Sequence, residues 1–409
     1  MCRRARAASR RVALSDRLTR DATLRRMAAT LLSRQTAILD ANARDLEDAR
    51  ARGTSGAMLD RLALDPKRIA QMADAVEQIA GLEDPLGAIL SDAKRPNGLR
   101  VRRVRVPIGV VAFVYEARPN VTTDAAALCL KAGNAVVLRG GSEAARSNAA
   151  LSHVIAEALE ASGLSRDAVQ TIPPGDREMV RELLQQIDTV DLAIPRGGEA
   201  FIRFVREVSR VPVIAHASGV CHLFLDAGAD TDMAVRLAVN GKLQRPGVCN
   251  AIECLLVDAR DAGRLLPPVA RALLDGGCEL RADDAARLLV PQAKAATDDD
   301  WGHEYMDRIL AVRVVGGIDG ALEHVARFGS GHTEAICTND DAHAARWRRE
   351  VDAACVTINA STRFHDGGEL GMGAEIGTAT TKLHWRGAMG LEGLTTFQWI
   401  IDGEGQTRG

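Results

Sequence analysis

The chain has 409 residues, of which 46% are hydrophobic and 26% are charged, and its formal net charge is -2. This length exceeds a single ordinary hydrophobic core, so we expect more than one domain. The near-zero net charge gives no electrostatic reason for a nucleic-acid partner, and no apolar run approaches the ~18 residues that a membrane span needs. Neither nucleic acid nor a membrane is therefore an expected partner.

The eight cysteines are scattered along the chain without a CxxC pair. In a chain of this length, that pattern favours reduced thiols over a disulfide framework or a zinc ribbon. The arginine-rich first residues lack the apolar core of a targeting peptide, and Asp16 and Asp21 soon follow. We therefore expect a cytoplasmic protein that begins with a basic helix.

Helical periodicity comes first along the chain. Apolar residues recur at helical spacing within residues 1–80, and this spacing predicts several helices. Alternation over 99–106, followed by an apolar run, predicts a strand or hairpin and then a buried strand. A helix is expected to follow and to end at Gly133, which suits a helix C-terminus.

Strands and helices then alternate. We expect strands at 135–139 and 191–195, each followed by a glycine-containing turn and a helix, and further strands at 211–216 and 221–226. A second run of strand, helix and strand falls within 251–315. This alternation predicts mostly parallel sheets covered on both faces. The glycine-rich stretch 360–380 is typical of a long ordered loop near a ligand.

Cys249 lies in a turn that contains glycine and proline, between a predicted helix and a predicted strand. A thiol held there can be exposed, and nearby cations such as Lys242 or Arg245 would lower its pKa. The alternative is a buried structural cysteine, which is the commoner case. The residues alone leave both interpretations open.

Two strand-end turns are candidates for binding a phosphate or a ribose. Arg139 to Ser142 and Pro195 to Gly198 each follow a strand and open a helix, whose first N–H groups and dipole attract anions. Ligands of parallel sheets bind at this edge. Neither turn has the GxGxxG pattern, so an ordinary tight connection remains the alternative.

Two further patterns have simple structural explanations. His216, Cys221 and His222 lie close together in sequence, but no fourth ligand is evident, so we favour buried or site-lining residues over a metal centre. Asn120 follows a strand. Its amide either donates to an oxyanion or caps the next helix, and capping is the simpler interpretation.

Long ordered blocks between about residue 35 and residue 395 carry a resemblance to known proteins. They include VPIGVVAFVYEARPNVTTDAAALCLKAGNAVVLRGGSEAARSN, IPRGG, HASGVCHLFLD, KLQRPGVCNAIE, ALEHVARFGSGHTEAI and INASTRFHDGGELGMGAEIGTATTKLHWRGAMGLEGLTT. These blocks resemble the aldehyde dehydrogenase superfamily and, within it, the gamma-glutamyl phosphate reductase family. The resemblance implies an α/β fold with a Rossmann-type cofactor domain, an α/β catalytic domain and a small oligomerisation arm.

The resemblance also implies roles for individual residues. Cys249 matches the family's nucleophile, and Asn120 matches the asparagine whose amide, with the Cys249 N–H, holds the oxyanion. Near the substrate it places His332, Asn359 and Arg363, the last as an anchor for a carboxylate by charge complementarity. It implies no metal. The residues that match cofactor contacts are Arg139, Gly140, Gly141, Ser142, Pro195, Arg196, Gly197, Gly198 and Glu304.

The implied reaction is the NADPH-dependent reduction of L-glutamyl 5-phosphate to L-glutamate 5-semialdehyde, with release of phosphate, in proline biosynthesis. By our alignment, His216 stands where hydrolytic relatives carry a water-activating glutamate, which would protect a thioester from water. Three alternatives remain: a hydrolytic NAD(P)-dependent aldehyde dehydrogenase, an acyl-CoA-linked reductase, and a non-catalytic nucleotide-binding protein of the same fold.

Domain boundaries and partners follow from the same resemblance. We expect a cofactor domain over 1–222, with 97–111 as part of an oligomerisation arm, and a catalytic domain over 223–365. Residues 366–409 are expected to return to the cofactor domain and to form an oligomerisation tail. A homodimer or a dimer-based tetramer is expected. A separate glutamate 5-kinase is the expected functional partner, because no kinase domain is present to make the acyl phosphate.

Overall fold

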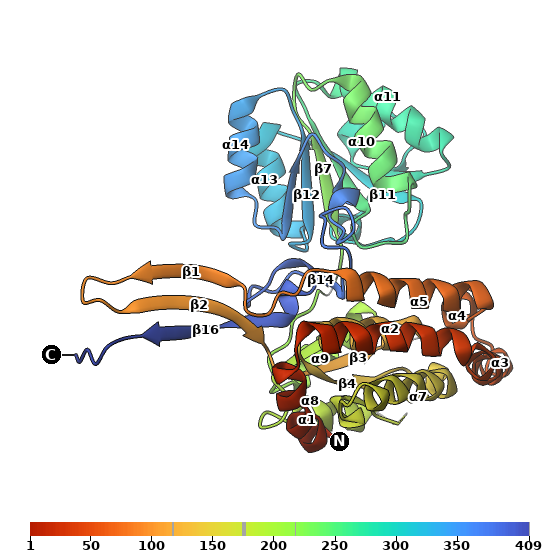
Figure 1. Ribbon diagram of the computed structural model, residues 1–409. Coiled ribbons are helices and arrows are strands. Elements are labelled where there is room, and N and C mark those ends of the chain that lie inside the picture. Colours follow the sequence, from red (N-terminus) through yellow and green to blue (C-terminus); the bar gives the residue numbers. More distant parts are fainter. Residues whose placement is uncertain (117, 174–176, 217, 409) are drawn as a thin grey trace.

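The computed structural model describes residues 1–116, 118–173, 177–216 and 218–408. Figure 1 shows two α/β bodies joined near the short strand β14, and a slender arm that projects from one of them. Within these residues, no helix is both long enough and apolar enough to cross a membrane. The α/β fold that the sequence predicts is confirmed.

The first body contains a four-stranded parallel sheet in the order β5-β4-β3-β6. Its strands are β3 (Val110–Tyr115), β4 (Ala135–Arg139), β5 (Val169–Thr171) and β6 (Leu192–Arg196). Its helices are α1 (Cys2–Leu14), α2 (Arg17–Ser33), α3 (Gln35–Ala51), α4 (Gly56–Leu62), α5 (Pro66–Gly81), α6 (Asn120–Lys131), α7 (Ala145–Ala161), α8 (Arg177–Leu184) and α9 (Glu199–Val208).

Helices cover both faces of this sheet because every side chain of β3 is buried. Alternate residues of a strand point to opposite faces. Val111 and Phe113 therefore pack into a core with α2, α5, α6 and α7, whereas Val110 and Val114 pack into a second core with α8 and α9. The continuous apolar run of β3 is the signature of a parallel strand that is buried on both sides.

The second body contains a seven-stranded sheet in the order β10-β9-β11-β8-β7-β12-β13, in which every pair is parallel. Its strands are β7 (Cys221–Leu225), β8 (Ile252–Asp258), β9 (Glu279–Ala282), β10 (Lys294–Ala295), β11 (Ile309–Val315), β12 (Thr333–Cys337) and β13 (Cys355–Ile358). Its helices are α10 (Thr231–Leu243), α11 (Ala262–Asp275), α12 (Asp284–Leu289), α13 (Gly317–Phe328) and α14 (Asp341–Glu350).

This second sheet is also covered on both faces. Leu223 and Leu225 of β7 pack with α10 and α11, while Phe224 packs on the other side with α13 and with Trp347 of α14. The Phe224 and Trp347 rings are stacked with centroids 5.8 Å apart. Two cores on two faces fix the sheet rigidly, and its strand ends therefore offer stable positions for functional side chains.

The arm is a three-stranded antiparallel sheet of β1 (Ile89–Lys94), β2 (Arg100–Pro107) and β16 (Thr395–Asp402), with β2 in the middle. The range 97–111 takes in β2 but not β1. Phe397 and Trp399 of β16 are about half exposed, and the Arg103 guanidinium lies over both rings. The arm lies outside the two bodies (Figure 1), and these two aromatic side chains are part of its surface.

The chain returns to the first body before it enters β16. Ala379 of β14 (Gly377–Ala379) and Met389 of β15 (Gly387–Met389) are part of the first body's core. Single turns of 3-10 helix complete the fold: η1 (Ser142–Ala144), η2 (Arg166–Ala168), η3 (Asp298–Asp300), η4 (Thr362–Phe364) and η5 (Glu392–Leu394).

The strand expected at 211–216 is wrong, and the segment forms only an isolated bridge between Val213 and Ala193. The segment looked like a strand because its apolar side chains, such as Ile214, are buried. Pro212 has no N–H to donate, so its carbonyl alone pairs with Ala193. The segment therefore passes along the edge of β6 and carries His216 toward the second body.

Candidate active site

Cys249 lies in the turn between α10 and β8, as the sequence predicts, and it is partly exposed. Hydrogen bonds hold the turn on both sides of the cysteine. The Ala251 N–H donates to the Val248 carbonyl, and the Asn250 side chain donates to the carbonyl of His365 at 3.1 Å. The thiol is thus held at the amino edge of the seven-stranded sheet, just before β8 and beside Cys221, the first residue of the parallel neighbouring strand β7.

Gly219 packs against the backbone of this turn more closely than any other residue type could. A Cβ added at Gly219 would lie 2.3 Å from the Cys249 carbonyl oxygen and 2.7 Å from the Glu304 Oε1. Glu304 also accepts a hydrogen bond from the Gly219 N–H, and burial raises the pKa of its carboxyl. Gly219 therefore holds Cys249 and Glu304 side by side.

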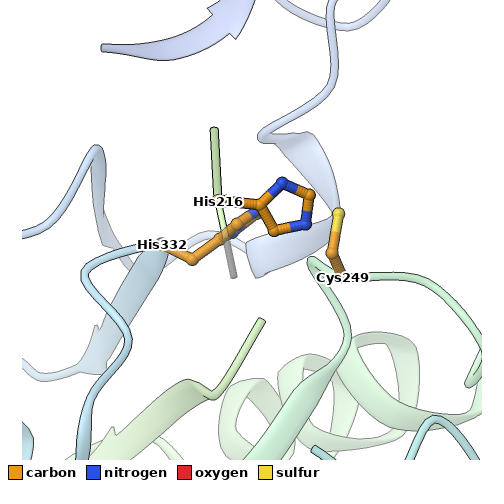
Figure 2. A group of neighbouring side chains, drawn as sticks. All are labelled: His216, Cys249 and His332. Carbon is orange, nitrogen blue, oxygen red and sulfur yellow. The ribbon is translucent and has the colours of Figure 1, made fainter. Parts of the chain in front are cut away.

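Two histidines stand beside Cys249. Donor atoms of His216, Cys249 and His332 all lie within 4.8 Å of one another, and Figure 2 shows the His216 ring next to the cysteine sulfur. The His216 Nδ1 lies 3.1 Å from the Thr378 carbonyl oxygen, which can only accept. Nδ1 therefore carries the hydrogen, and the His216 Nε2 keeps a free lone pair.

His332 has the opposite tautomer, which follows from a chain of hydrogen bonds. The Ala388 N–H donates to His365 Nε2, so the Nδ1 of His365 carries a hydrogen and donates to the Thr333 hydroxyl at 2.8 Å. The Thr333 hydroxyl in turn donates to His332 Nδ1 at 2.7 Å. The His332 Nε2 must then carry the hydrogen, and this fully buried N–H has no partner among the described residues.

The environment of Cys249 keeps its thiol protonated in the free protein. Burial raises the pKa of the Cys249 thiol, and the carboxylates of Glu304 and Glu375 raise it further, whereas Arg196 lowers it. The Cys221 thiol contacts the Cys249 carbonyl oxygen at 3.2 Å and the His332 Nδ1 at 3.6 Å. Lys242, which is close to Cys249 in sequence, forms a fully buried pair with Glu253 at 2.5 Å instead.

Asn120 is the first residue of α6, and it does not cap that helix, whose N-cap is Pro119. Its amide donates to the Asp124 carboxylate at 3.0 Å. Burial raises the pKa of Asp124 to about 6, and the bond from Asn120 opposes that rise. Because an amide nitrogen has two hydrogens, one remains available after the bond to Asp124.

The two glycine turns that the sequence singled out follow β4 and β6, the neighbours of β3 on either side. A Cβ at Gly140 would meet the Asn148 side chain at 2.2 Å, and one at Gly197 would meet Glu116 at 2.6 Å. The Gly198 N–H donates to the same Glu116 carboxylate at 3.1 Å. Both turns are therefore tight, bare backbone at the carboxyl edge of one sheet, and a nucleotide can approach such backbone closely.

The other residues of these two turns lie at the strand ends or in the segments that lead into the next helix. Arg139 ends β4, and Gly141 and Ser142 lead through η1 into α7; Pro195 lies within β6. The Arg196 guanidinium lies 2.4 Å from where a Cβ on Gly377 of β14 would stand, and its charge lowers the pKa of the Cys249 thiol. It also depresses the pKa of His216.

The two remaining residues that the sequence placed near the substrate differ in how many hydrogen-bonding groups they leave available for a ligand. Asn359 has a positive φ of 54° and exchanges two hydrogen bonds of 2.9 Å with the Thr338 backbone, so its amide joins the ends of β12 and β13. Arg363 donates from Nε to Gln244 at 2.9 Å, which leaves its two terminal nitrogens for a ligand. A role in substrate binding stays a prediction for both residues.

Sequence reasoning did not find Gly219, His365, Glu375 or Thr378. Their contribution depends on contacts between segments that are far apart in the chain. His216 and Thr378, for example, are 162 residues apart in sequence. Only the glycine in HASGV gave a local signal, since a glycine that no turn requires often marks a close approach of backbone.

Among the residues that the structure describes, two groups of side chains have donors close enough for a metal ion to be considered: His216, Cys249 and His332, and His222, Cys254 and His324. In the first, the deduced tautomer points a hydrogen of His332, not a lone pair, at the site. In the second, Arg313 donates to the His324 Nδ1 at 3.0 Å, so the His324 Nε2 carries the hydrogen. Metals bind neutral imidazole through a lone pair, so we assign a metal to neither group.

The chain is similar to known proteins along its whole length. Residues 1–275 match the aldehyde dehydrogenase family. The chain is 57% identical over 407 residues to the gamma-glutamyl phosphate reductase of Anaeromyxobacter sp. (strain K), covering 98% of this chain and 95% of that protein. It is also 57% identical over 413 residues to the protein of the same name from Sorangium cellulosum (strain So ce56), covering 100% of this chain and 97% of that one.

Among solved structures, the gamma-glutamyl phosphate reductase of Thermotoga maritima superposes with a TM-score of 0.98 at 42% identity, covering 100% of this chain and 99% of that chain. An acetylating aldehyde dehydrogenase from Geobacillus thermoglucosidasius superposes with a TM-score of 0.69 at 17% identity, covering 100% of this chain and 96% of that chain. The second likeness concerns the fold alone.

Proposed function

This chain belongs to the aldehyde dehydrogenase family and, within it, to the gamma-glutamyl phosphate reductases, and from that premise we propose that Cys249 performs the reduction of L-glutamyl 5-phosphate through a thioester. The observation that carries this assignment is the position of Cys249. Its thiol is partly exposed in a turn held by hydrogen bonds, beside one imidazole with a free lone pair and a second whose N–H has no partner among the described residues.

In the first half of the reaction, the Cys249 sulfur attacks the γ-acyl carbon of the substrate, and the bond to the phosphate oxygen breaks. The negative charge on the acyl oxygen needs donors, which the free hydrogen of the Asn120 amide and the Cys249 N–H are proposed to supply. Such a donor typically contributes ~2.7–4 kcal/mol to the barrier. The bond from Asn120 to Asp124 supports this role because it orients the amide before the substrate arrives.

The second half of the reaction requires a nicotinamide cofactor, and the residues present fit one. The glycines at 140 and 197 pack tightly against Asn148 and Glu116, and with no side chain of their own they leave the turn backbone open to a close approach by a nucleotide. The turns after β4 and β6, together with Glu304 beside Cys249, are proposed to hold the adenosine side and the nicotinamide ribose respectively. A bound NADPH would supply the hydride that reduces the thioester. Glu304 and Gly219 keep the reacting end of this site against Cys249.

The remaining assignments concern specificity and partners. Arg363 is proposed to hold the substrate's α-carboxylate through its terminal nitrogens, which a planar carboxylate can accept in pairs. NADPH is preferred over NADH in this proposal because Arg139 can pair with a 2′-phosphate. We also propose a cytoplasmic homodimer or dimer-based tetramer built through the arm, whose half-exposed aromatic residues suit an interface. A separate glutamate 5-kinase would supply the labile substrate.

The experiment that tests this function runs the reaction backwards. The protein is incubated with L-glutamate 5-semialdehyde and NADP, and the absorbance of the reduced cofactor is followed with and without inorganic phosphate. We expect reduction that requires phosphate. Reduction without phosphate would identify a hydrolytic dehydrogenase, and reduction that requires CoA would identify an acyl-CoA-linked enzyme. Cofactor binding without turnover would leave only a nucleotide-binding protein.

A further inference from the structure

The two histidines beside Cys249 have complementary tautomers. His216 offers a lone pair at Nε2, because its Nδ1–H is committed to the Thr378 carbonyl. His332 offers a hydrogen at Nε2, because its Nδ1 accepts from the Thr333 hydroxyl. Both imidazoles lie within 4.8 Å of the cysteine at their nearest donor atoms. One ring can therefore take a proton from the thiol, and the other can only donate a hydrogen bond.

His216 is also the accessible ring of the two. It is partly exposed, whereas His332 is completely buried and linked through Thr333 to His365. The charged and titratable groups that face His216 are Cys249, His332 and the Arg196 guanidinium, which belong to three different elements. No carboxylate accepts from its Nδ1, so the ring is neutral when the substrate arrives.

We propose that His216 is a catalytic proton shuttle, which takes the proton of the Cys249 thiol at Nε2 and delivers it to the departing phosphate. This assignment rests on the proposed function and adds the group that handles the proton. In hydrolytic relatives a water-activating glutamate is expected at this position. A glutamate carboxylate at this position would repel the phosphoryl dianion of the substrate, whereas the neutral imidazole of His216 does not.

The step balances without any further reactant. The C–S bond forms as the C–O bond to phosphate breaks, and the thiol proton leaves on the phosphate, so acyl phosphate dianion and thiol give thioester and hydrogen phosphate dianion. His216 begins and ends the step neutral. The thioester is then reduced, and the Cys249 thiolate that leaves takes up one proton from the solution, which the overall reduction requires.

Electrostatics favour the release of the proton to the phosphate. Burial, and then the nearby Arg196 guanidinium, lowers the pKa of His216 to about 4, so the protonated ring is a strong acid. Phosphate bound near Arg196 would offset that positive charge and raise the proton affinity of the ring while the substrate is in place. The bound acyl phosphate thus makes His216 a stronger base while the thiol proton is being transferred. His216 can therefore accept that proton and then release it.

The test uses the intact protein and the reverse reaction, in which Cys249 forms the thioester before phosphate cleaves it. Glutamine at position 216 can keep an N–H for the Thr378 carbonyl but cannot carry a proton between two atoms. At alkaline pH, where the thiolate forms without help, we expect H216Q to give a burst of about one reduced cofactor per subunit. Phosphate-dependent turnover after the burst should then be about 100-fold slower than in the unaltered protein.

Three comparisons separate the shuttle from structural damage. H332Q keeps an N–H donor, so its loss of turnover should be smaller than that of H216Q. His153→Gln is the matched control, because His153 is exposed on α7 and outside the site. In H216A, added imidazole should restore part of the turnover, which it would not do for a misfolded site.

Each outcome decides the proposal. A normal burst followed by turnover at the unaltered rate in H216Q would overturn the shuttle and leave the proposed function standing. A greater loss in H332Q than in H216Q would also overturn it, as would the lack of any rescue by imidazole. Cofactor reduction that does not need phosphate in the unaltered protein would overturn the proposed function, and the shuttle would fall with it.

Discussion

The contact between Gly219 and the Cys249 turn gives the most specific prediction about catalysis. In Gly219→Ala, a methyl group would lie 2.3 Å from the Cys249 carbonyl oxygen and 2.7 Å from both the Cys249 Cα and the Glu304 Oε1. An ordinary carbon contact is ~3.5–4.0 Å, so these atoms must separate by roughly 1 Å or more. The obstacle is backbone, which cannot rotate away as a flexible side chain can.

A displacement of about 1 Å between reacting groups can cost about 100-fold in rate. We therefore expect Gly219→Ala to lower kcat/KM in the reverse assay by about 100-fold. Overpacking should also lower the free energy of unfolding by about 1–3 kcal/mol. Alkylation of the Cys249 thiol by iodoacetamide would report the same displacement without any need for the substrate.

Gly263→Ala serves as the control, because an added Cβ there meets nothing within 4 Å on the exposed face of α11. It should keep full activity, and its helix should gain slightly in stability, since alanine favours helices over glycine by about 1 kcal/mol. Full activity in Gly219→Ala, with an unchanged rate of alkylation, would show that this packing does not position the nucleophile.

Three further predictions concern other parts of the site. Lys242→Met leaves the buried Glu253 carboxylate without its partner, so the free energy of unfolding should fall by about 3–5 kcal/mol in urea titrations; an unchanged midpoint would contradict this. Asn120→Ala should reduce turnover by about 100-fold or more with unchanged cofactor affinity, and a loss confined to affinity would remove the oxyanion role. Burial and Glu304 raise the pKa of the Cys249 thiol, so the rate of its alkylation in the free protein should still increase with pH beyond the ordinary thiol range. Glu304→Gln should shift that pH profile to lower pH. A rate of alkylation that reaches its plateau near neutrality would refute this electrostatic account.

Much of the fold was accessible from the sequence because its signals are local. The apolar run of β3 predicts a strand that is buried on two faces, and Gly133, with a φ of 77°, ends α6 as expected. The segment 211–216 misled the same reasoning. Its apolar residues are buried by packing, while Pro212 prevents a regular ladder of hydrogen bonds.

The site was predictable to a smaller extent, because its chemistry depends on residues that are far apart in the chain. The turn made Cys249 a candidate, which only the family resemblance singled out as the nucleophile, and the tautomer of His332 depends on His365 and on the backbone of Ala388. No sequence pattern encodes such a relay. Lys242 illustrates the converse, since it is seven positions before Cys249 in the chain and yet pairs with Glu253 in the interior.

The most direct test of the central claim is to trap the intermediate on Cys249. The protein is mixed with L-glutamate 5-semialdehyde and NADP in the absence of phosphate, quenched in acid, digested and examined by mass spectrometry. We predict a glutamyl adduct on the peptide that contains Cys249, and its disappearance when phosphate is added before the quench. An adduct on another cysteine, or one that water removes as fast as phosphate does, would contradict a Cys249 thioester that phosphate resolves.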